Sequence, residues 1–593
     1  MNASYEKVTS LEELAKNTDK TAQSLSEISL ISFDFFDTLF GRPLTNPEDL
    51  FDIMGERFGI PNFRTIRKSS QAEAFQKMHQ RGGNEITVED IYECLPQCDI
   101  CPAELMKAEI ELELSILKPI EEVFSLFKSL RDNGWAVCIT SDMYLGESFF
   151  KRILKAYDLH DIPLYISSTC NATKRDRGEL FNVLTKRSGI PAERILHIGD
   201  NYTADVQRAK ESGINALHYQ PKPELLVTTC PSLGTSLATG LLHYNKNGIT
   251  PNSFKSFGYI FGGPATVGFL HWIAQRAKTD SIDKLLFISR DGYMLDQINH
   301  DVDHLDLPSS TYFYGSRTAF TLAAMNSNNF EEFIPFLLSG AEGLSPEELL
   351  ERIGVHAPSE DIMKDLALDA SVKISTSNHH LLTQFLHAYR WEILKICQRN
   401  RRAYFQYFNK LGIKAGMRIA IIDVGWSGTT QEAFERMVNV LFDAEVIGYY
   451  FCLADTPERL ARENIMKMHS MINSDEYPAE LVAQIHINRV AIELLFSAPH
   501  NSIIGLYPSL ESIQPLHDAG RGESSNLNHT SEEINAGILD FYHDFSSMAQ
   551  YGISTASLIS PAIELATNVH KSALDILLTV KGFDAWGSSR NHK

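Results

Sequence analysis

Four short apolar runs, each followed by a helix-like stretch, constrain the fold of the first part of this chain more than any other feature. The runs are LISFDFF (30–36), WAVCIT (135–140), LYISS (164–168) and RILHIGD (194–200). Strands that are apolar throughout and separated by helices are typical of a parallel sheet covered on both faces. We therefore predict an α/β domain of this kind for residues 1–225.

The long segment between the first two runs reads as helix, notably in PEDLFDIMGERFG and AELMKAEIELELSILKPIEEVFSLFKSL. A helical insertion directly after the first strand suits a lid over the sheet edge, so we expect a cap at about residues 45–125. Residues 221–250 are rich in Pro, Ser, Thr and Gly, and we expect a linker at 226–254.

A second alternation of apolar runs and helical patterns begins near residue 255, and we expect a second α/β domain at 255–515. Its predicted strands lie within 284–290, 309–316, 418–425 and 446–453. The segment 325–412 is predicted to be mainly helical. Gln514 to Thr530 is polar and is predicted to be a loop, and residues 530–593 are predicted to form a helical tail.

Composition and charge limit the classes of partner. The 593 residues are too many for one hydrophobic core, and a net charge of −21 disfavours nucleic acid and anionic membranes as partners. The N-terminal stretch MNASYEKVTSLEELAKNTDK has no basic segment followed by an apolar one, so no signal peptide is predicted. Phe257 to Ala274 is apolar, but Pro264, several glycines and His271 favour a buried helix over membrane insertion. We expect a cytoplasmic protein.

The eight cysteines are scattered, which suits free thiols in a reducing compartment. Cys94, Cys98 and Cys101 have a spacing found in iron–sulfur proteins. Their flanks read as helix–turn–helix and Ile100 precedes the third cysteine, so we expect no cluster there.

Polar side chains follow each apolar run of the first domain. Asp34 ends the first run, Thr140 and Ser141 end the second, Lys174 follows the third, and Asp200 and Asp205 follow the fourth. Because the carboxyl ends of parallel strands meet at one edge of a sheet, we expect these groups to form one site. Carboxylates at such an edge suit a hard cation.

The order and spacing of these residues resemble the haloacid dehalogenase (HAD) superfamily over about residues 28–220. The stretch GDNYTADVQRAKESGINALHY and the helical insertion match it too. The resemblance implies a Rossmann-like core with an inserted cap and a Mg²⁺-dependent phosphatase that acts through an aspartyl-phosphate. It implies Asp34 as the nucleophile, Lys174 as a neutralising cation, and Ser141 as a hydrogen-bond donor to the phosphoryl group, with Thr140 as the alternative.

The same resemblance implies that Asp34, the carbonyl of Phe36 and Asp200 bind Mg²⁺, with Asp205 as a ligand or as a partner behind the ligands. Phe36 departs from the pattern, because phosphatases of the superfamily usually have an Asp there as general acid. Dehalogenases and phosphonatases of the superfamily lack it. Asp37 is either a turn residue or a displaced acid. A dehalogenase-like or phosphotransfer enzyme is therefore an alternative.

Most of the chain also resembles large two-part bacterial proteins of this superfamily whose genes accompany polysaccharide-assembly genes. The matching stretches are SFDFFDTLFGRP, TSDMYL, LLFISRDGYML, YGSRTA, IIDVGWSGTTQ and IELLFSAPHNSIIGLY. This resemblance implies a small phosphorylated substrate, such as a sugar or polyol phosphate, and polysaccharide-assembly proteins as partners.

The second domain has a candidate site of its own. Arg290 and Asp291 follow one predicted strand, and Asp423 and Thr429 flank a Gly-rich turn after another, where backbone amides can hold an anion. The two turns faintly resemble the phosphate loops of phosphoribosyltransferases. Three other polar residues read as caps or satisfied buried groups: Arg317, Glu493 and His500.

Two further classes of function stay open. A phosphate-sensing binding or scaffold protein would use the first site without turnover. A glycosyl or phosphoribosyl transferase would place its chemistry in the second domain.

Overall fold

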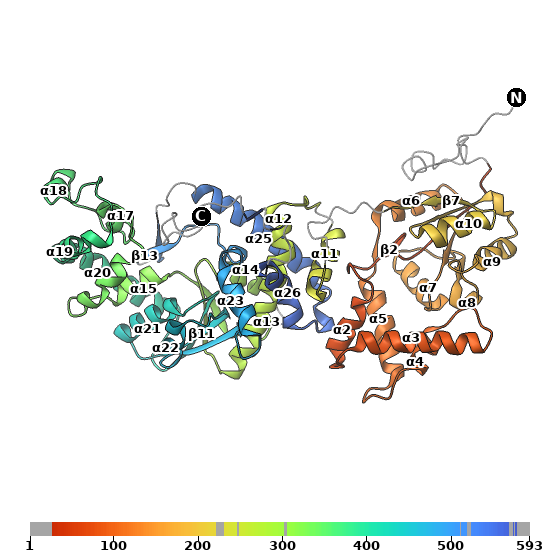
Figure 1. Cartoon of the computed structure of the whole chain (residues 1–593), viewed down its shortest axis with the longest axis horizontal. Coiled ribbons are helices and arrows are strands. Elements are labelled where there is room, and N and C mark those ends of the chain that lie inside the picture. The colour runs from red at the N-terminus through yellow and green to blue at the C-terminus, as the bar shows by residue number, and fades with distance from the viewer. Residues whose placement is uncertain are drawn as a thin grey trace, which may run out of the picture. The chain divides into compact units, whose positions relative to one another are not determined.

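The computed structural model describes residues 27–220, 230–245, 248–301, 305–509, 512–518 and 524–567, together with residues 573, 576 and 577. The chain divides into two compact units (Figure 1). Unit 1 consists of Met1–Leu225, Thr235–Gly248 and Asp544–Ser554, and unit 2 of Leu226–Gly234, Ile249–His543 and Thr555–Lys593. The N-terminal segment, part of the predicted linker and most of the predicted tail beyond residue 567 lie outside the described residues.

Unit 1 is built on a five-stranded parallel sheet in the order β5-β4-β1-β6-β7. The strands are β1 (Leu30–Phe33), β4 (Val137–Ser141), β5 (Leu164–Ile166), β6 (Ile195–Gly199) and β7 (Asn215–His218). β1 lies in the centre, where Ile31 pairs with Val137 on one side and Leu196 on the other. A strand with neighbours on both edges and helices on both faces is mainly apolar, and a polar residue within it needs a buried hydrogen-bond partner. The predicted parallel α/β organisation is confirmed.

Amphipathic helices cover this sheet. They are α6 (Glu121–Asp132), α7 (Glu147–Ala156), α8 (Ser167–Cys170), α9 (Glu179–Ser188) and α10 (Arg208–Glu211), with the π-helical turn η3 (Tyr202–Gln207) and the short 3₁₀ turn η2 (Ala192–Arg194). In α7, Phe149, Phe150 and Ile153 form the buried face, which is the spacing of an amphipathic helix.

The helical insertion lies between β1 and β4. Its helices are α2 (Asp49–Phe58), α3 (Phe63–Gln80), α4 (Val88–Glu93) and α5 (Pro102–Ile116). The chain enters and leaves it through a two-residue antiparallel pair, β2 (Phe40–Gly41) with β3 (Lys118–Pro119). Inside it, the buried guanidinium of Arg67 donates two hydrogen bonds of 2.8 Å to Glu109. The predicted insertion is therefore a helical layer whose mainly apolar interior contains a buried ion pair.

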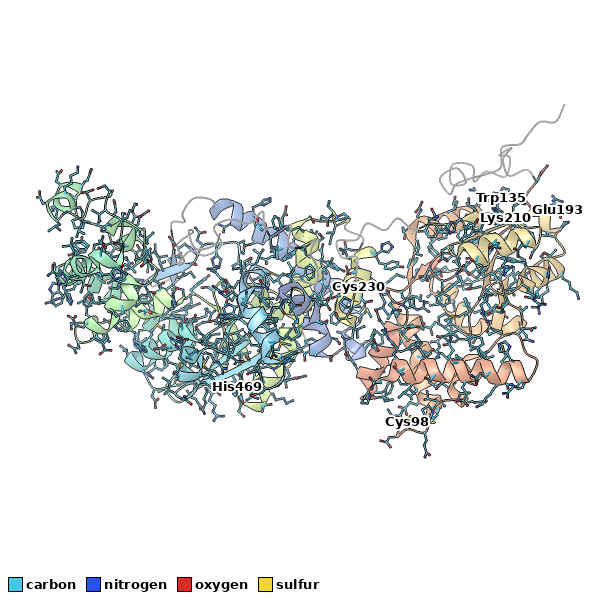
Figure 2. The ribbon with its side chains drawn as sticks, viewed as in Figure 1. Cys98, Trp135, Glu193, Lys210, Cys230 and His469 are labelled. Atoms are coloured by element: carbon cyan, nitrogen blue, oxygen red, sulfur yellow. The ribbon has the colours of Figure 1, made fainter. Side chains whose placement is uncertain are left out.

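The cysteine-rich stretch connects two of these helices. Cys94 ends α4, and Cys101 immediately precedes α5. Cys98 lies on the loop that projects between them (Figure 2). The structure joins no two cysteines of the described residues in a disulfide, and the predicted helix–turn–helix is confirmed.

The segment predicted as a linker contains the helix α11 (Leu233–His243), most of which belongs to unit 1. The hydroxyl of Ser236 accepts a hydrogen bond of 2.9 Å from the amide of Thr45. Gly240 lies directly against the backbone of Pro43, where a Cβ atom would clash. Close backbone packing thus ties this helix to the start of the insertion.

Unit 2 has its own five-stranded parallel sheet, in the order β12-β11-β10-β8-β9. The strands are β8 (Lys284–Ile288), β9 (Ser309–Phe313), β10 (Arg418–Asp423), β11 (Glu445–Cys452) and β12 (Lys467–Ile472). The first four coincide with predicted strands. β12 is an additional edge strand, and its sequence KMHSMI mixes polar and apolar residues because one edge lacks a neighbour.

Helices surround this second sheet. The helices that follow the strands along the chain are α14 (Tyr293–Asp301), α15 (Arg317–Ala324), α21 (Thr429–Leu441), α22 (Pro457–Glu463), α23 (Ala479–Ile487) and α24 (Arg489–Leu495). Between β9 and β10 the chain forms η5 (Phe330–Phe333), α16 (Ile334–Leu338), α17 (Pro346–Glu351), α18 (Glu360–Asp365), η6 (Thr376–Asn378), α19 (His379–Ala388) and α20 (Arg390–Lys410). The mainly helical character predicted for this segment is confirmed.

The apolar stretch from Phe257 to Ala274 forms a buried helical segment. It comprises the end of α12 (Phe254–Phe257), the π-helical η4 (Gly258–Gly262) and most of α13 (Gly263–Thr279). Glycines let other helices approach its backbone, as where Gly258 meets the backbone of Ile534. Among the described residues, no helix combines the length and the apolarity needed to cross a membrane.

The prediction of a loop from Gln514 to Thr530 is wrong. β14 (Gln514–His517) pairs antiparallel with β13 (Ile503–Tyr507), and α25 (Ser524–Ser546) begins within the predicted loop and is followed by α26 (Thr555–Ala566). Backbone pairing with β13 holds the polar strand QPLH in place without an apolar face of its own. The first turn of α25 is SSNL, composed mainly of residue types that sequence patterns assign to turns.

Candidate active site in unit 1

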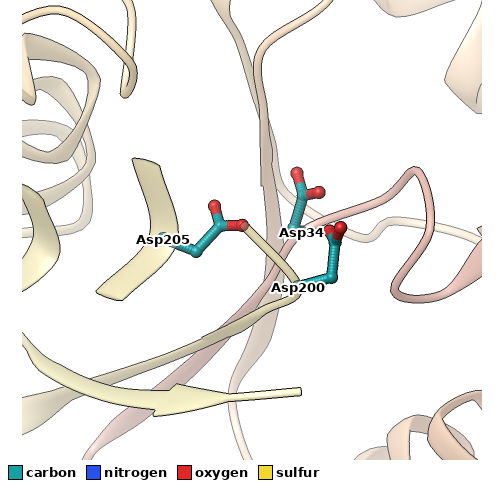
Figure 3. A group of neighbouring side chains, drawn as sticks. All are labelled: Asp34, Asp200 and Asp205. Carbon is teal, nitrogen blue, oxygen red and sulfur yellow. The ribbon is translucent and has the colours of Figure 1, made fainter. Parts of the chain in front are cut away.

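Asp34 directly follows the central strand β1 and lies at the carboxyl edge of the sheet. Its amide donates to the carbonyl of Ile198 on β6, at 2.8 Å, and its side chain is buried. Asp34, Asp200 and Asp205 each offer a carboxylate oxygen, and these oxygens lie within 4.8 Å of one another. Figure 3 shows the carboxylates of Asp34 and Asp200 side by side, with Asp205 approaching from the turn that follows. Three acids from two stretches of the chain thus meet at one edge.

Lys174 joins two of these acids. Its Nζ donates to Asp34 Oδ1 at 2.7 Å and to Asp205 Oδ1 at 2.5 Å, and the residue is only 2% exposed. The carboxylate of Asp142 accepts the amides of Lys174 and Arg175 at 2.8 and 2.9 Å, which fixes the loop that carries the lysine. A buried ammonium is therefore held between two carboxylates.

The pKa values follow from burial and from this shared cation. Burial raises the pKa of Asp34 to about 7, and the attraction of Lys174 offsets only part of that shift. Burial also acts to raise the pKa of Asp205, but Lys174 and then His197 outweigh it and hold that pKa below its usual range. For Lys174, burial acts to lower the pKa, and the charges of Asp205 and Asp34 raise it above normal.

A chain of buried hydrogen bonds continues beneath the site. His197 Nε2 lies 3.2 Å from Asp205 Oδ1, and its Nδ1 lies 2.9 Å from the hydroxyl of Ser32. The Ser32 hydroxyl donates to Thr140 Oγ1 at 2.8 Å. The side chains of His197, Ser32 and Thr140 are buried in the sheet and support Asp205 from below.

Asp200 is held from two sides. The Thr38 hydroxyl donates to Asp200 Oδ1 at 3.2 Å, and the Asp200 amide lies 3.1 Å from the same hydroxyl oxygen. His218 Nε2 lies 2.7 Å from the Asp200 carbonyl. Burial, then the charges of Asp37 and Asp205, raise the pKa of Asp200. This acid is thus ordered but remains electrostatically unfavourable without a cation.

Ser141 is the last residue of β4 and is 1% exposed. Thr140, the alternative for its role, has its hydroxyl engaged with Ser32 inside the sheet. The structure therefore brings both residues to the strand end, and only Thr140 takes part in the buried chain beneath the acids.

The position of the expected general acid is occupied by an aromatic cluster. The Phe36 ring stacks on Phe149 with centroids 6.3 Å apart, and the guanidinium of Arg42 lies over its face at 4.6 Å. Arg42 is fixed by Glu113 of the insertion through Nε and Nη2, with the shortest contact at 2.7 Å. The side chain two positions after Asp34 is apolar and carries a cation on its face.

Asp37 forms the turn that follows the strand. Its φ of 56° lies in the left-handed region, and its amide donates to the carbonyl of Phe40 at 2.7 Å. The side chain is exposed, although partial desolvation by the surrounding loop raises its pKa and Arg42 acts to lower it. Asp37 is therefore a turn residue whose charge acts on Asp200.

The helical insertion reaches the edge of the site. Arg175, next to Lys174, donates two hydrogen bonds to Glu85 of the insertion, at 2.7 and 2.9 Å. Tyr144, on the loop after β4, donates to Glu109 of α5 at 3.0 Å. Sequence reasoning missed these contacts, as well as Arg42, Thr38 and His197, because nothing in one sequence pairs residues so far apart.

Unit 2 gathers its candidates at the edge of its own sheet. Asp423 ends β10 and is buried, and Asp291 Oδ2 accepts a hydrogen bond of 3.3 Å from Val424. Thr429 begins α21, and the amide of Arg290 donates to the hydroxyl of Tyr312 at 2.9 Å. The three residues expected to be satisfied or capping have these places: Arg317 begins α15, Glu493 accepts from Trp426 Nε1 at 2.7 Å, and His500 Nε2 lies 2.6 Å from the Tyr312 hydroxyl.

No family model matches the chain, and no curated protein matches it either. Similar solved structures include a HAD-hydrolase, YfnB, from Bacillus subtilis bound to magnesium, with 18% identity, a TM-score of 0.25, and coverage of 32% of this chain and 87% of that one. A HAD phosphatase from Thermococcus onnurineus has 18% identity, a TM-score of 0.24, and coverage of 32% and 86%. The L-2-haloacid dehalogenase from Xanthobacter autotrophicus has 15% identity, a TM-score of 0.26, and coverage of 34% and 80%. These partial likenesses are to proteins called HAD hydrolases, phosphatases and dehalogenases.

Proposed function

We propose that unit 1 is a HAD-type phosphatase that hydrolyses a small phosphorylated metabolite through an aspartyl-phosphate on Asp34. The observation that carries the proposal is the 2.7 Å hydrogen bond from Lys174 to Asp34, within a group of three carboxylates whose oxygens lie within 4.8 Å of one another. A cation that holds one oxygen of a buried carboxylate orients it for attack and offsets the charge of an incoming phosphate.

In the proposed reaction, an oxygen of Asp34 attacks phosphorus, and the bond to the leaving oxygen breaks with both its electrons. Lys174 offsets the charge on the transferred group, and the Ser141 hydroxyl would donate to one of its oxygens. Water then attacks the acyl-phosphate at phosphorus, which releases inorganic phosphate and restores the Asp34 carboxylate.

The donor set fits a hard divalent cation, because all three side chains offer carboxylate oxygens. Asp34, Asp200 and the carbonyl of Phe36 would hold Mg²⁺. Asp205 would act from behind these ligands, since its two oxygens already accept hydrogen bonds from Lys174 and from the Asn201 amide. When bound, Mg²⁺ would supply charge neutralisation between the carboxylates and the phosphate.

Phosphate release from a panel of sugar and polyol phosphates tests the proposal. We expect Asp34→Asn to lower kcat by about 10³-fold or more, because an amide does not form the acyl-phosphate. Asp132→Asn is the matched control, since Asp132 is exposed on α6 and, within the part of the chain that the structure describes, pairs with its neighbour Arg131 alone. Equal activity in wild type and Asp34→Asn would contradict the assignment of the nucleophile.

The substrate class is the less constrained part of the proposal. We propose a sugar or polyol phosphate of surface polysaccharide assembly, acted on in the cytoplasm, with polysaccharide-assembly proteins as partners. The sequence resemblance is its support. Turnover of phosphorylated substrates outside this class, with none inside it, would argue against it.

Phe36 favours a second candidate, a phosphotransfer or dehalogenase-like reaction whose leaving group needs no proton. Its ring packs on Phe149 and beneath Arg42, so the usual position of the general acid offers no proton. We expect acetyl phosphate and p-nitrophenyl phosphate to react much faster than alkyl phosphates, because their leaving groups depart without protonation.

The matched pair Phe36→Asp and Phe36→Asn tests this reading. Phe36→Asp is expected to raise turnover of alkyl phosphates by about 10²-fold, the contribution of one general acid, while Phe36→Asn leaves it unchanged. Similar wild-type rates for all leaving groups would instead identify another acid, with Asp37 the nearest candidate in sequence. Halide release from 2-haloacids would identify a dehalogenase.

A further inference from the structure

The helix α11 runs beside the stretch of chain that follows Asp34, although its sequence lies beyond the residues that resemble the HAD superfamily. Positions 236, 240 and 244 are four residues apart, so they lie on one side of the helix and of the turn that ends it. In order, the contacts are Ser236 with Thr45, Gly240 with Pro43 and Tyr244 with Gly41. The last of these brings a tyrosine from the predicted linker to the turn after the proposed nucleophile.

The side chain of Tyr244 ends close to Asp37. A Cβ atom at Gly41 would clash with the Tyr244 hydroxyl and would lie 3.7 Å from Asp37 Oδ1, so both oxygens border the space that glycine leaves open. In the part of the chain that the structure describes, neither the Tyr244 hydroxyl nor the Asp37 carboxylate forms a hydrogen bond. The Asn245 side chain donates to Asp544 at 2.7 Å, which fixes the residue after the tyrosine. Two polar groups without partners thus border one small space.

This space adjoins the proposed metal site. Burial and then the charge of Asp37 raise the pKa of Asp200, and the same two causes raise the pKa of Tyr244, so the Asp37 carboxylate lies near both groups. Asp37 is exposed and Tyr244 is half-buried, so a bound molecule can reach them. In-line attack by Asp34 directs the leaving group away from the sheet edge, and the turn that carries Asp37 leads from that edge to the insertion. The leaving group is therefore expected to pass beside Asp37 and Tyr244.

The charges around this space favour a hydroxyl over a charged group. Asp37 and Asp200 are both acidic, and the nearby guanidinium of Arg42 is already engaged by Glu113 through Nε and Nη2. A second anionic group on the substrate would be repelled by the two carboxylates, and a cationic one by Arg42. A hydroxyl can donate to the Asp37 carboxylate and accept from the Tyr244 hydroxyl at the same time.

We infer that Asp37 and Tyr244 bind a hydroxyl of the leaving group, so that unit 1 selects phosphate esters of a polyol or sugar with a hydroxyl close to the ester oxygen. The inference rests on the proposed phosphatase and adds a pair of specificity-determining residues to it. No step of the reaction passes through either residue. Because Tyr244 comes from α11, this part of the site is completed by a segment that follows the sheet in sequence.

Calorimetric titration of the full chain carrying Asp34→Asn, with Mg²⁺ present, measures binding without turnover. The probes are glycerol 1-phosphate and propyl phosphate, which have three carbons each and differ in their hydroxyls. We expect glycerol 1-phosphate to bind about tenfold more tightly, the effect of one hydrogen bond to a charged group. Equal affinities, or binding of neither probe, would overturn the inference. Failure of the proposed phosphatase gives a different result, in which the preference persists but the wild type releases no phosphate from any substrate.

Two variants in the Asp34→Asn background test the role of Tyr244, with circular dichroism to verify folding. Tyr244→Phe removes the hydroxyl and keeps the ring, and we expect the preference for glycerol 1-phosphate to fall about fivefold, the loss of one neutral hydrogen bond. Gly41→Ala should lower it as well, because the added Cβ displaces the Tyr244 hydroxyl.

Tyr157→Phe is the matched control for the loss of a hydroxyl. Its ring packs on Phe40 and Phe124 in the same unit, and the preference should stay as it is without the substitution. A preference unchanged in Tyr244→Phe would overturn the role of that residue. Tighter binding of phosphoethanolamine than of glycerol 1-phosphate would overturn the hydroxyl as the recognised group in favour of an ammonium.

Discussion

Lys174 faces two carboxylates with a single positive charge. Its Nζ contacts Asp34 and Asp205 at 2.7 and 2.5 Å, and all three side chains are buried. Two buried anions next to one cation are under-compensated, so one of them must attract a proton or a further cation. Asp34 is the acid that is affected, because burial raises its pKa to about 7. Lys174 and His197 instead hold the pKa of Asp205 below its usual range. A residue poised in this way is suited to receive a cation.

His500 provides a pH-dependent prediction for unit 2. Its Nε2 lies 2.6 Å from the Tyr312 hydroxyl and its Nδ1 lies 2.9 Å from the Asn501 carbonyl, an arrangement that suits neutral imidazole. Burial lowers its pKa from 6.5; the hydrogen bond with the Asn501 carbonyl acts to raise the pKa, and the charges of His517 and Arg290 act to lower it. The unfolded chain therefore takes up a proton below pH 6.5 that the folded chain refuses, and stability falls as the pH drops.

We expect this group to contribute a slope of at most about 1.4 kcal/mol per pH unit below pH 6.5. Urea unfolding at several pH values measures it. His500→Gln should flatten that part of the profile, whereas exposed His529 replaced by Gln should not. An unchanged profile in His500→Gln would show that the imidazole titrates normally in the folded state.

At the residue scale, the sequence predicts the acidic residues of the site better than the buried residues whose hydrogen bonds hold them in place. Asp34, Asp200 and Asp205 could be proposed because each follows an apolar run, and a parallel sheet has one carboxyl edge. Ser32 and His197 could not, since each reads as one polar residue within a strand. Only the register that sets Ser32 beside His197 reveals their pairing.

Among the elements of unit 2, α25 packs closely against the glycine-rich helical segment Phe257 to Ala274. Gly258 meets the backbone of Ile534, and Gly537 meets the carbonyl of Lys255. Neither glycine has a positive φ, so the requirement is for space rather than for backbone conformation. The same glycines that disfavour a membrane span are the ones used for close helix packing.

Gly258→Ala should therefore destabilise unit 2. A Cβ there would clash with the Ile534 carbonyl, and overpacking of this kind costs about 1–3 kcal/mol. The urea midpoint measures the effect. Gly146→Ala is the control, because an added Cβ there meets nothing within 4 Å. A loss no larger than that of the control would mean that the two helices separate at little cost.

Element prediction fails where backbone pairing replaces hydrophobic pattern. β12 and β14 are polar or mixed in sequence, and each is held by hydrogen bonds to one neighbour, β11 or β13. The central strands β1 and β10 are apolar because they have neighbours on both edges. A buried central strand can be recognised from its apolar composition. An edge strand depends on its hydrogen bonds to the neighbouring strand, which its own sequence does not indicate.

At the scale of the molecule, the units are not continuous in sequence. Unit 1 contains Asp544–Ser554 from near the other end of the chain, and the Ser554 amide donates to Glu56 of α2 at 2.8 Å. No sequence pattern assigns this segment to unit 1, because a short stretch of mixed polar and apolar residues is compatible with either unit. Cutting the chain at residue 225 would remove part of unit 1.

Ligand binding should stabilise the units separately. We expect Mg²⁺ with beryllofluoride to raise the unfolding temperature of unit 1, since a ligand at about a hundredfold excess over its Kd adds about 2.7 kcal/mol. Differential scanning calorimetry measures the shift, and Asp34→Asn should lose it. Stabilisation without turnover of any substrate would favour a phosphate-sensing protein over an enzyme. No shift in wild type would contradict the cation site.

The ribbon formed by β2 and β3 makes the helical insertion a detachable module. Gly41 pairs with Lys118, so the polypeptide departs and returns at adjacent points. Everything between these residues can lengthen, shrink or be exchanged without altering the path from β1 to β4. Selectivity can therefore evolve, or be engineered, by grafting another insertion onto the same two residues, provided that Arg42, Arg175 and Tyr144 receive new partners in place of Glu113, Glu85 and Glu109.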